Sequence, residues 1–232
     1  MRRETSNRIR FIIEDLLPPL VKDGRLFGLV ARAAFGPSVD DAKRFRNQAP
    51  FLTEEQYEQY YRDWRGPHGE TDNSQACIDR ITQDVVGDSV CDVGCGTGYL
   101  LRHLRDSLPR KPARLTGAEM LVVERSDNQG LDLHASRAER LPFADKAFDT
   151  VICTHVIEHL LNYREAIAEL RRIAAQRLII VVPMERESLY GFNLHVNFFP
   201  YPHSFLRAMI PVPRNHVCLA IGRDIYYCED IA

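Results

Sequence analysis

One glycine-rich stretch constrains the fold of this 232-residue chain more than any other feature. The run Ser89–Val93 favours a β-strand and contains an acid, Asp92; a helical pattern begins a few residues later. Strand, tight turn and helix in this order are typical of an open α/β sheet. Because glycine lacks a Cβ, the backbone can turn sharply at this point and approach a ligand closely. The turn has three glycines at alternate positions, Gly94, Gly96 and Gly98.

The spacing of these glycines also narrows the kind of ligand. The pattern G-x-G-x-G after Asp92 differs from the dinucleotide fingerprint G-x-G-x-x-G, whose third glycine would fall at Tyr99. A pyrophosphate would require that fingerprint at the helix N-terminus. The turn therefore favours a ligand without a pyrophosphate, and an ordinary strand-to-helix turn is the alternative on this motif alone.

Composition excludes several classes of protein. A hydrophobic fraction of 45% with 27% charged residues is ordinary for a globular protein, and a formal net charge of -2 gives no general attraction to nucleic acid. The six cysteines include no C-x-x-C pair, so we expect reduced thiols. We find no signal peptide and no apolar run of membrane-spanning length. The expected protein is soluble and cytoplasmic.

Residues 74–232 form the predicted main domain. After a helix at about 74–85, strands and helices alternate, which predicts a mostly parallel sheet with helices on both faces. Two short β runs around Gly222 predict a terminal antiparallel hairpin. The predicted strands are Ser89–Val93, Arg114–Ala118, Leu131–Ala135, Phe148–Cys153, Leu178–Val182, Val217–Ile221 and Ile225–Cys228.

Residues 1–73 are predicted to form a helical appendage. Apolar residues at three- and four-residue steps predict a helix that Pro18-Pro19 ends or kinks, and a second helix over Leu26–Ala34. The sequence Thr53–Gln56 is a capping box, and an aromatic stripe follows it. We favour a lid packed on the main domain. Because the region is locally basic, peripheral contact with an anionic membrane surface is the alternative.

Two acids at the ends of successive strands form the most informative pair. Glu119 lies 21 residues after Gly98, where a carboxylate can accept hydrogen bonds from both hydroxyls of a ribose. Asp92 can receive the ammonium group of an amino acid. Glu124 is the rival acid if residues 120–123 are the strand; we prefer Glu119, because Thr116-Gly117 is typical of a strand that passes tightly by the first turn. The pair predicts a ligand with a ribose, an amino acid and no phosphate.

Five motifs follow one another along the main domain: Asp92-Val-Gly-Cys-Gly-Thr-Gly98, Thr116-Gly-Ala-Glu119, Leu141-Pro-Phe143, Phe148-Asp149 and Val156-Ile-Glu-His-Leu160. In this order they resemble the motifs of class I S-adenosylmethionine-dependent methyltransferases, most closely the small-molecule branch (type 11-like). The resemblance covers about residues 75–185 and implies a Rossmann-like, doubly wound, seven-stranded sheet whose last strand is antiparallel. It implies S-adenosylmethionine as the cofactor and methyl transfer as the reaction.

The same resemblance implies a set of cofactor-binding residues. Arg137 stands where the family often has an acid, so recognition of adenine would use backbone amides or Glu139 instead. Thr154 and His155 would border the transferred methyl group. The methionine end of the cofactor would be bound by Asp92, Gly94, Cys95, Gly96 and Gly98. The ribose would be held by Glu119, one adenine face would be covered by Met120, and the adenine edge would be contacted by Ala138 and Glu139.

An oxygen nucleophile must lose its proton, and histidine is the side chain best suited to take it near neutral pH. An amine nucleophile needs no base. Our first candidate for the base is His155, our second is His195, and His159 and His203 are further candidates. We favour a hydroxyl acceptor, on a sugar, a ring or a lipid-linked head group.

A metal site is the alternative for one of these motifs. On a helix, His155, Glu158 and His159 would share a face and could bind a divalent cation. The motif faintly resembles the metal-binding E-x-x-E-H of small-RNA 2′-O-methyltransferases, although His155 replaces the first acid. We expect no metal here, because metal-free small-molecule relatives contain the same Val-Ile-Glu-His. A metal-assisted RNA 2′-O-methyltransferase and a non-catalytic nucleoside-binding subunit are the alternative functions.

Residues 184–216 form a predicted insertion on the substrate side of the main domain. The part from Tyr190 to His203 is dense in aromatic and hydrogen-bonding side chains, which suit a small-molecule acceptor. A packed cap or a dimer contact is an equally good interpretation of this stretch. We expect a small-molecule substrate and no nucleic-acid partner.

Overall fold

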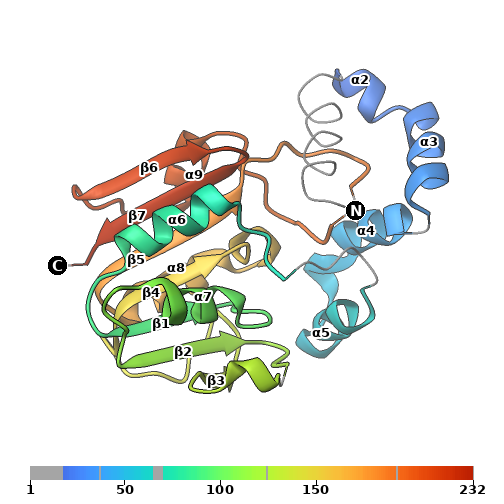
Figure 1. Ribbon diagram of the computed structural model, residues 1–232. Coiled ribbons are helices and arrows are strands. Elements are labelled where there is room, and N and C mark those ends of the chain that lie inside the picture. Colours follow the sequence, from blue (N-terminus) through green and yellow to red (C-terminus); the bar gives the residue numbers. More distant parts are fainter. Residues whose placement is uncertain (1–17, 37, 65–69, 124, 192, 232) are drawn as a thin grey trace. The chain divides into compact units, whose positions relative to one another are not determined.

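The computed structural model describes residues 18–36, 38–64, 70–123, 125–191 and 193–231 (Figure 1). The chain divides into two compact units. The sheet unit consists of residues 69–184 and 199–232, and the helical unit combines residues 1–68 with residues 185–198. The sequence-based division into 1–73 and 74–232 kept residues 185–198 with the sheet, whereas here this segment packs with the N-terminal helices. The helix expected before Pro18 lies outside the described residues.

The sheet unit contains seven strands in the order β3-β2-β1-β4-β5-β7-β6. Neighbours from β3 to β5 are parallel, and β7 is antiparallel to both β5 and β6. The mostly parallel sheet with a terminal hairpin is therefore confirmed. The strands are β1 (Ser89–Val93), β2 (Arg114–Glu119), β3 (Asp132–Ala135), β4 (Phe148–Thr154), β5 (Ala174–Pro183), β6 (His216–Ile221) and β7 (Asp224–Asp230).

Helices cover both faces of this sheet (Figure 1). Helices α6 (Gln75–Asp84) and α7 (Tyr99–Ser107) pack on one face, and α8 (Tyr163–Ile173) and α9 (Pro202–Ala208) pack on the other. Alternate residues of β5 divide between the two cores, because successive side chains of a strand point to opposite faces. A strand buried on both faces is expected to be apolar throughout, as Leu178–Val182 is.

Two features of this unit differ from the sequence-based expectation. Strand β5 begins at Ala174, directly after α8 ends at Ile173, so the predicted strand is extended toward its N-terminus and no loop intervenes. Helix α9 lies in the stretch that was expected to be an insertion, and its Phe205 and Ala208 are buried against the sheet. All six cysteines are free, as expected, and five of them are buried.

The helical unit is built from short amphipathic helices. Its elements are α2 (Pro19–Lys22), α3 (Arg25–Phe35), α4 (Ser38–Gln48), the 3-10 helix η2 (Ala49–Phe51) and α5 (Glu54–Asp63). The predicted capping box is present, since the Thr53 side chain accepts from the Gln56 amide and Gln56 returns the bond. The aromatic stripe of α5 packs around Phe45 and Leu194, with the Phe45 and Tyr57 rings 5.3 Å apart.

Residues 185–198 are bound to these helices through polar contacts. The Arg46 guanidinium on α4 donates to the carbonyl oxygens of Ser188 at 2.6 Å and His195 at 3.1 Å. The buried Lys22 ammonium donates to the Glu187 carbonyl at 2.8 Å. Two cations thus hold the main chain of a segment whose described residues, 185–191 and 193–198, form no helix or strand of their own. We refer to it as the 185–198 segment.

No helix in the described ranges is both long and apolar enough to cross a membrane.

A buried ion pair joins α8 to the terminal hairpin. The Arg171 guanidinium donates to both oxygens of Glu229, at 2.6 and 2.8 Å, and the Tyr227 hydroxyl donates to the same carboxylate. Glu229 is only 1% exposed. Hydrogen bonding to this carboxylate raises the pKa of Arg171.

We expect Arg171→Met to lower the free energy of unfolding by about 3–5 kcal/mol, because it leaves a buried carboxylate without its cation. Urea denaturation would measure this loss. The matched control is Arg110→Met, which breaks the Arg110–Asp88 pair on the surface, where the two side chains are 82% and 48% exposed. The control should change stability by less than about 1 kcal/mol. Equal effects of the two substitutions would contradict a structural role for the buried pair.

Candidate functional site

The first strand ends at the point where the strand order of the sheet reverses. Strand β1 has β2 on one side and β4 on the other, and in α/β sheets a ligand binds beyond the carboxyl ends of the strands at such a point. Asp92 pairs in register with Gly117 of β2 and with Ile152 of β4, and it is 2% exposed. One oxygen of its carboxylate, Oδ1, has no hydrogen-bond partner among the described residues.

The turn after β1 depends on its glycines. Gly94, Gly96 and Gly98 have φ values of 78°, 51° and 79°, a region that residues with a Cβ rarely adopt. A Cβ on Gly94 would lie 2.0 Å from Cγ2 of Val156, and one on Gly98 would lie 2.9 Å from Oδ1 of Asn128. A Cβ on Gly96 would meet nothing within 4 Å. The turn is therefore packed on its protein side and open at Gly96.

Glu119 borders the same turn from β2. Its Oε2 accepts from the Gly96 amide at 2.8 Å, and its Oε1 accepts from the Met120 amide at 2.8 Å. The preference for Glu119 as the acid that ends the strand agrees with these bonds; Glu124 lies outside the described residues. Burial, together with the negative charge of Glu119, raises the pKa of Asp92 to about 7. The two predicted acids thus lie on the same turn and influence each other electrostatically.

The close approach of β2 to this turn has a cause at Gly117. A Cβ on this residue would lie 2.6 Å from the Cys95 sulfur and 2.6 Å from Cδ2 of Leu133. The amides of Gly94 and Cys95 donate to the Ala118 carbonyl at 2.7 and 3.3 Å. The expectation that Thr116-Gly117 passes tightly by the turn is consistent with this packing.

Sequence reasoning missed the side chain that supports the turn. Arg102 on α7 is 8% exposed, and its Nη1 donates at 2.6 Å both to the Thr97 carbonyl inside the turn and to Oδ1 of Asn128. Asn128 belongs to the 3-10 helix η3 (Ser126–Asn128), which follows β2. An arginine four residues after Gly98, on an otherwise apolar helix face, was the available signal.

The residues expected at the adenine lie in the loop after β3. Ala138 is buried, and the Glu139 carboxylate accepts from Arg137 at 3.4 Å. The loop is held in place by Arg172 of α8, which donates to the carbonyl oxygens of Leu141 and Phe143. This contact gives the Leu141-Pro-Phe143 motif a structural role. In the same loop Arg137, the departure from the family pattern, pairs with Glu139, the acid two residues later.

Thr154 and His155 follow at the end of β4. The Thr154 hydroxyl accepts from the Asn73 amide at 2.9 Å in a buried bond. His155 has a φ of +56°, so its backbone is strained in the way that is often found at functional positions. Its ring lies between two acids, with Nδ1 3.5 Å from Glu158 and Nε2 3.8 Å from Asp224. Burial lowers the pKa of His155, but these acids outweigh burial and the net shift is upward.

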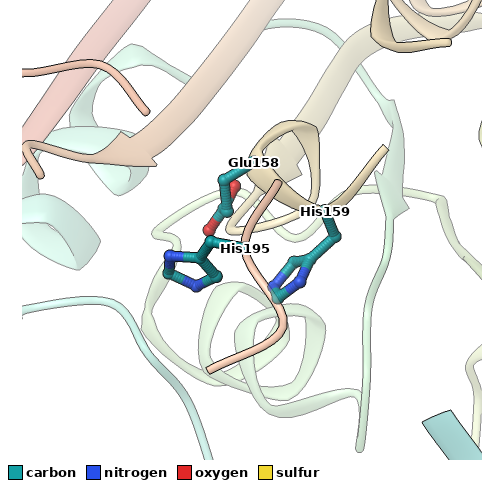
Figure 2. A group of neighbouring side chains, drawn as sticks. All are labelled: Glu158, His159 and His195. Atoms are coloured by element: carbon teal, nitrogen blue, oxygen red, sulfur yellow. The ribbon is translucent and has the colours of Figure 1, made fainter. Parts of the chain in front are cut away.

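The segment after His155 is not an α-helix. Residues 157–159 form a single 3-10 turn, η4 (Ile157–His159), from which the side chains of Glu158 and His159 both project (Figure 2). The alternative in which His155, Glu158 and His159 share one face of an α-helix is therefore not the arrangement of this segment. The physical reason is the left-handed backbone at His155, which cannot belong to a right-handed helix.

The remaining predicted histidines lie further along the chain. His195, which Figure 2 also draws, belongs to the helical unit, where its Nδ1 lies 2.8 Å from Oε2 of Glu185. His203 is exposed on α9, and its ring stacks on Tyr201 with the centroids 5.2 Å apart. The structure thus gathers the predicted cofactor residues on one edge of the sheet, whereas His195 belongs to the helical unit.

Comparisons with known proteins agree with this site. Residues 91–181 match the family described as a methyltransferase domain. The chain is 33% identical over 144 residues to malonyl-[acyl-carrier protein] O-methyltransferase from Geobacter sulfurreducens, which covers 58% of this chain and 47% of that protein. It is 36% identical over 91 residues to a dTDP-3-amino-3,6-dideoxy-alpha-D-glucopyranose N,N-dimethyltransferase from Streptomyces fradiae, covering 39% of this chain and 35% of the relative.

A solved structure of a Pyrococcus horikoshii protein has the same fold, with a TM-score of 0.53 at 16% identity over 75% of this chain and 99% of that one. Residues 91–181 belong to a class I S-adenosylmethionine-dependent methyltransferase domain, as the motifs implied. The cofactor of this class is S-adenosylmethionine. The chain spans about half the length, or less, of the two curated relatives, and these relatives are named for different acceptors.

We expect Gly94→Ala to destabilise the protein more than Gly222→Ala does. Both glycines have a positive φ, at 78° and 61°, but only Gly94 has a neighbour that a new methyl group would overlap. The difference should be about 1–3 kcal/mol in the free energy of unfolding, the usual cost of overpacking. Urea denaturation of the ligand-free protein would measure it. Equal losses would mean that the contact with Val156 does not constrain the turn.

Proposed function

We propose that this chain transfers the methyl group of S-adenosylmethionine to a hydroxyl group of a small molecule. The observation that supports this most strongly is the pair of carboxylates on one turn: buried Asp92 on one side, Glu119 on the other, and open backbone at Gly96 between them. A ligand with a cationic group at one end and a diol at the other matches that arrangement.

The residues present fit the cofactor. Asp92 has a buried carboxylate oxygen without a partner among the described residues, and an ammonium group would neutralise and bind it. Glu119 would hold the ribose hydroxyls, and the turn would take the methionine end against its backbone. Met120, Ala138, Glu139 and Thr154 are the further proposed contacts. When bound, the cofactor supplies an electrophilic methyl group on a sulfonium.

The choice of a hydroxyl acceptor depends on a base. His155 keeps its proton to a higher pH than an ordinary histidine, because acids surround it. Its position directly after β4 is the observation that favours it as the base. His155 therefore stays our first candidate for the base, with His195, which is hydrogen-bonded to Glu185, second and His159 third.

The acceptor can be tested directly. The purified protein would be incubated with methyl-labelled S-adenosylmethionine and the small-molecule fraction of a cell extract, and mass spectrometry would locate the label. A methyl group on oxygen supports the proposal. A label found only on nitrogen, or only on added RNA, would contradict the proposed acceptor, and the absence of any transfer would favour a non-catalytic binding role.

We expect Glu119→Gln and Asp92→Asn each to weaken the binding of S-adenosylmethionine by about ten- to hundredfold, since each removes one charge-assisted interaction. Isothermal titration calorimetry would measure the dissociation constants. Asp106→Asn is the control, because this carboxylate pairs with Arg105 on the exposed side of α7. Affinities that equal the wild-type value in both site variants would remove the basis of the proposal.

We expect cofactor binding to release a proton below pH 7. With a pKa of about 7, the Asp92 carboxyl is mostly protonated at pH 6, and a bound ammonium group favours its ionised form. Affinity should therefore rise between pH 5 and pH 7 and level off above. Calorimetry at pH 6 in buffers of different ionisation enthalpy would count the protons released. The release should disappear in Asp92→Asn; a release that persists there would assign the proton to another group.

A further inference from the structure

The loop at residues 136–143 follows β3 and contains the two residues expected at the adenine edge. Residues 137–140 form a tight turn, which is closed by an isolated bridge and by a hydrogen bond of 3.1 Å from its last amide to its first carbonyl. Ala138 and Glu139 are the central residues of this turn. Their place at the site is therefore set by the contacts that fix the loop.

The loop lies beside the acid that would hold the ribose. Glu119 pairs in register with Ala135, the last residue of β3, and the Ser136 amide donates to the Glu119 carbonyl at 3.0 Å. Strands β1, β2 and β3 are neighbours and parallel, so Asp92, Glu119 and the loop follow one another along one edge of the sheet (Figure 1). A ligand that has its amino acid at β1 and its ribose at β2 would bring its base to this loop.

An ion pair on α8 holds the far end of the loop by its main chain. Arg172 donates to both oxygens of Glu169, at 2.7 and 2.8 Å. The same guanidinium donates to the carbonyl of Phe143 at 2.7 Å and to that of Leu141 at 3.1 Å. The Leu141 amide donates to the Glu169 carboxylate at 2.9 Å. Both main-chain polar groups of Leu141 are thus bound by one pair of side chains from another element.

Apolar contacts fix the same part of the loop. Leu141 and Ala138 are 5% and 8% exposed, and both belong to the core that α8 forms with the sheet. The Phe143 ring meets those of Phe148 on β4 and His134 on β3 edge to face, with centroids 4.9 and 5.1 Å apart. The side chains of the loop are therefore packed on the sheet, while α8 binds its main chain.

We propose that Arg172 and Glu169 are positioning residues that make the site select an adenine base. This inference rests on the proposed function and adds to it the residues that set the purine preference. Neither side chain is one of the proposed cofactor contacts, and each acts through the main chain of the loop. A loop that is held in place before binding offers fixed hydrogen-bonding groups to the edge of the base. A site built in this way rejects an analogue that lacks the matching group.

Two ligands that differ only at the purine test this inference. S-adenosylhomocysteine carries adenine, and its analogue S-inosylhomocysteine has an oxygen in place of the 6-amino group. We expect the wild-type protein to bind the adenine compound at least about tenfold more tightly in isothermal titration calorimetry. Arg172→Met should weaken the binding of the adenine compound by about tenfold, because the loop must then be ordered on binding. Binding of the inosine compound should change little, so the preference for adenine should be largely lost.

Arg177→Met is the matched control. Arg177 also donates to a carboxylate, that of Asp230, and to a carbonyl, that of Asp84. It lies on β5 in register with the start of β4, whereas the site is at the carboxyl ends of the strands. Its loss should leave both dissociation constants unchanged. Arg172→Lys, which keeps the charge beside Glu169 but has a single nitrogen, should retain part of the preference.

The Leu141 amide gives a readout that needs no ligand. Its hydrogen exchange should be faster in Glu169→Ala, which removes the acceptor, than in the wild-type protein. A wild-type protein that binds both compounds equally would overturn the inference. So would an Arg172→Met variant that keeps the wild-type preference, or an Arg177→Met variant that loses it. Failure of the wild-type protein to bind S-adenosylhomocysteine would instead refute the proposed function, so the two failures are distinguishable.

Discussion

The arrangement of the site depends on the carboxylate of Asp92, which the sheet buries and which pairs with no cation among the described residues. Asp92 lies between two parallel strands at 2% exposure, and the nearby charge of Glu119 makes its ionisation still less favourable. In an ordinary core such a residue would be paired or replaced, because a buried charge is costly without a partner. Its position here makes sense if the missing partner is a ligand. The fold supplies the rigidity, and the cationic ligand would supply the charge that the protein lacks.

The Asp92 carboxylate can bind a ligand only if the backbone of the adjacent turn does not fill the space beside it. Val156 fills the space behind Gly94, Cys95 and Leu133 fill the space over Gly117, and Arg102 ties the Thr97 carbonyl to Asn128. These contacts fix the turn from its protein side and leave Gly96 open. These supports come from helix α7 through Arg102, from strand β3 through Leu133 and from the residues after β4 through Val156. A change at Val156, Leu133 or Arg102 would alter this turn, although none of the three is among the proposed cofactor contacts.

Much of the sheet could be predicted from sequence, because buried parallel strands are continuous apolar runs and glycines mark the turn that matters. The parts that were missed have physical reasons. Helix α4 is polar overall, yet Val39, Ala42 and Phe45 recur every three residues and are fully buried, a signal that its many charges conceal. The 3-10 turn at residues 157–159 was not recognised, because the spacing of residues along the sequence says nothing about the left-handed φ of His155. Arg102 supports the turn through Thr97 and Asn128, and no motif records such support.

The union of the 185–198 segment with the N-terminal helices has a consequence for how proteins of this architecture can diversify. The segment comes from the far end of the chain, yet its main-chain carbonyls are bound by Arg46 and Lys22. In a chimaera that exchanged only this segment, the half-buried guanidinium of Arg46 and the buried ammonium of Lys22 would face carbonyl oxygens in new positions. Inheritance of both pieces together avoids that mismatch. Stretches of sequence separated by more than a hundred residues therefore behave as one exchangeable module, while the sheet between them stays the same.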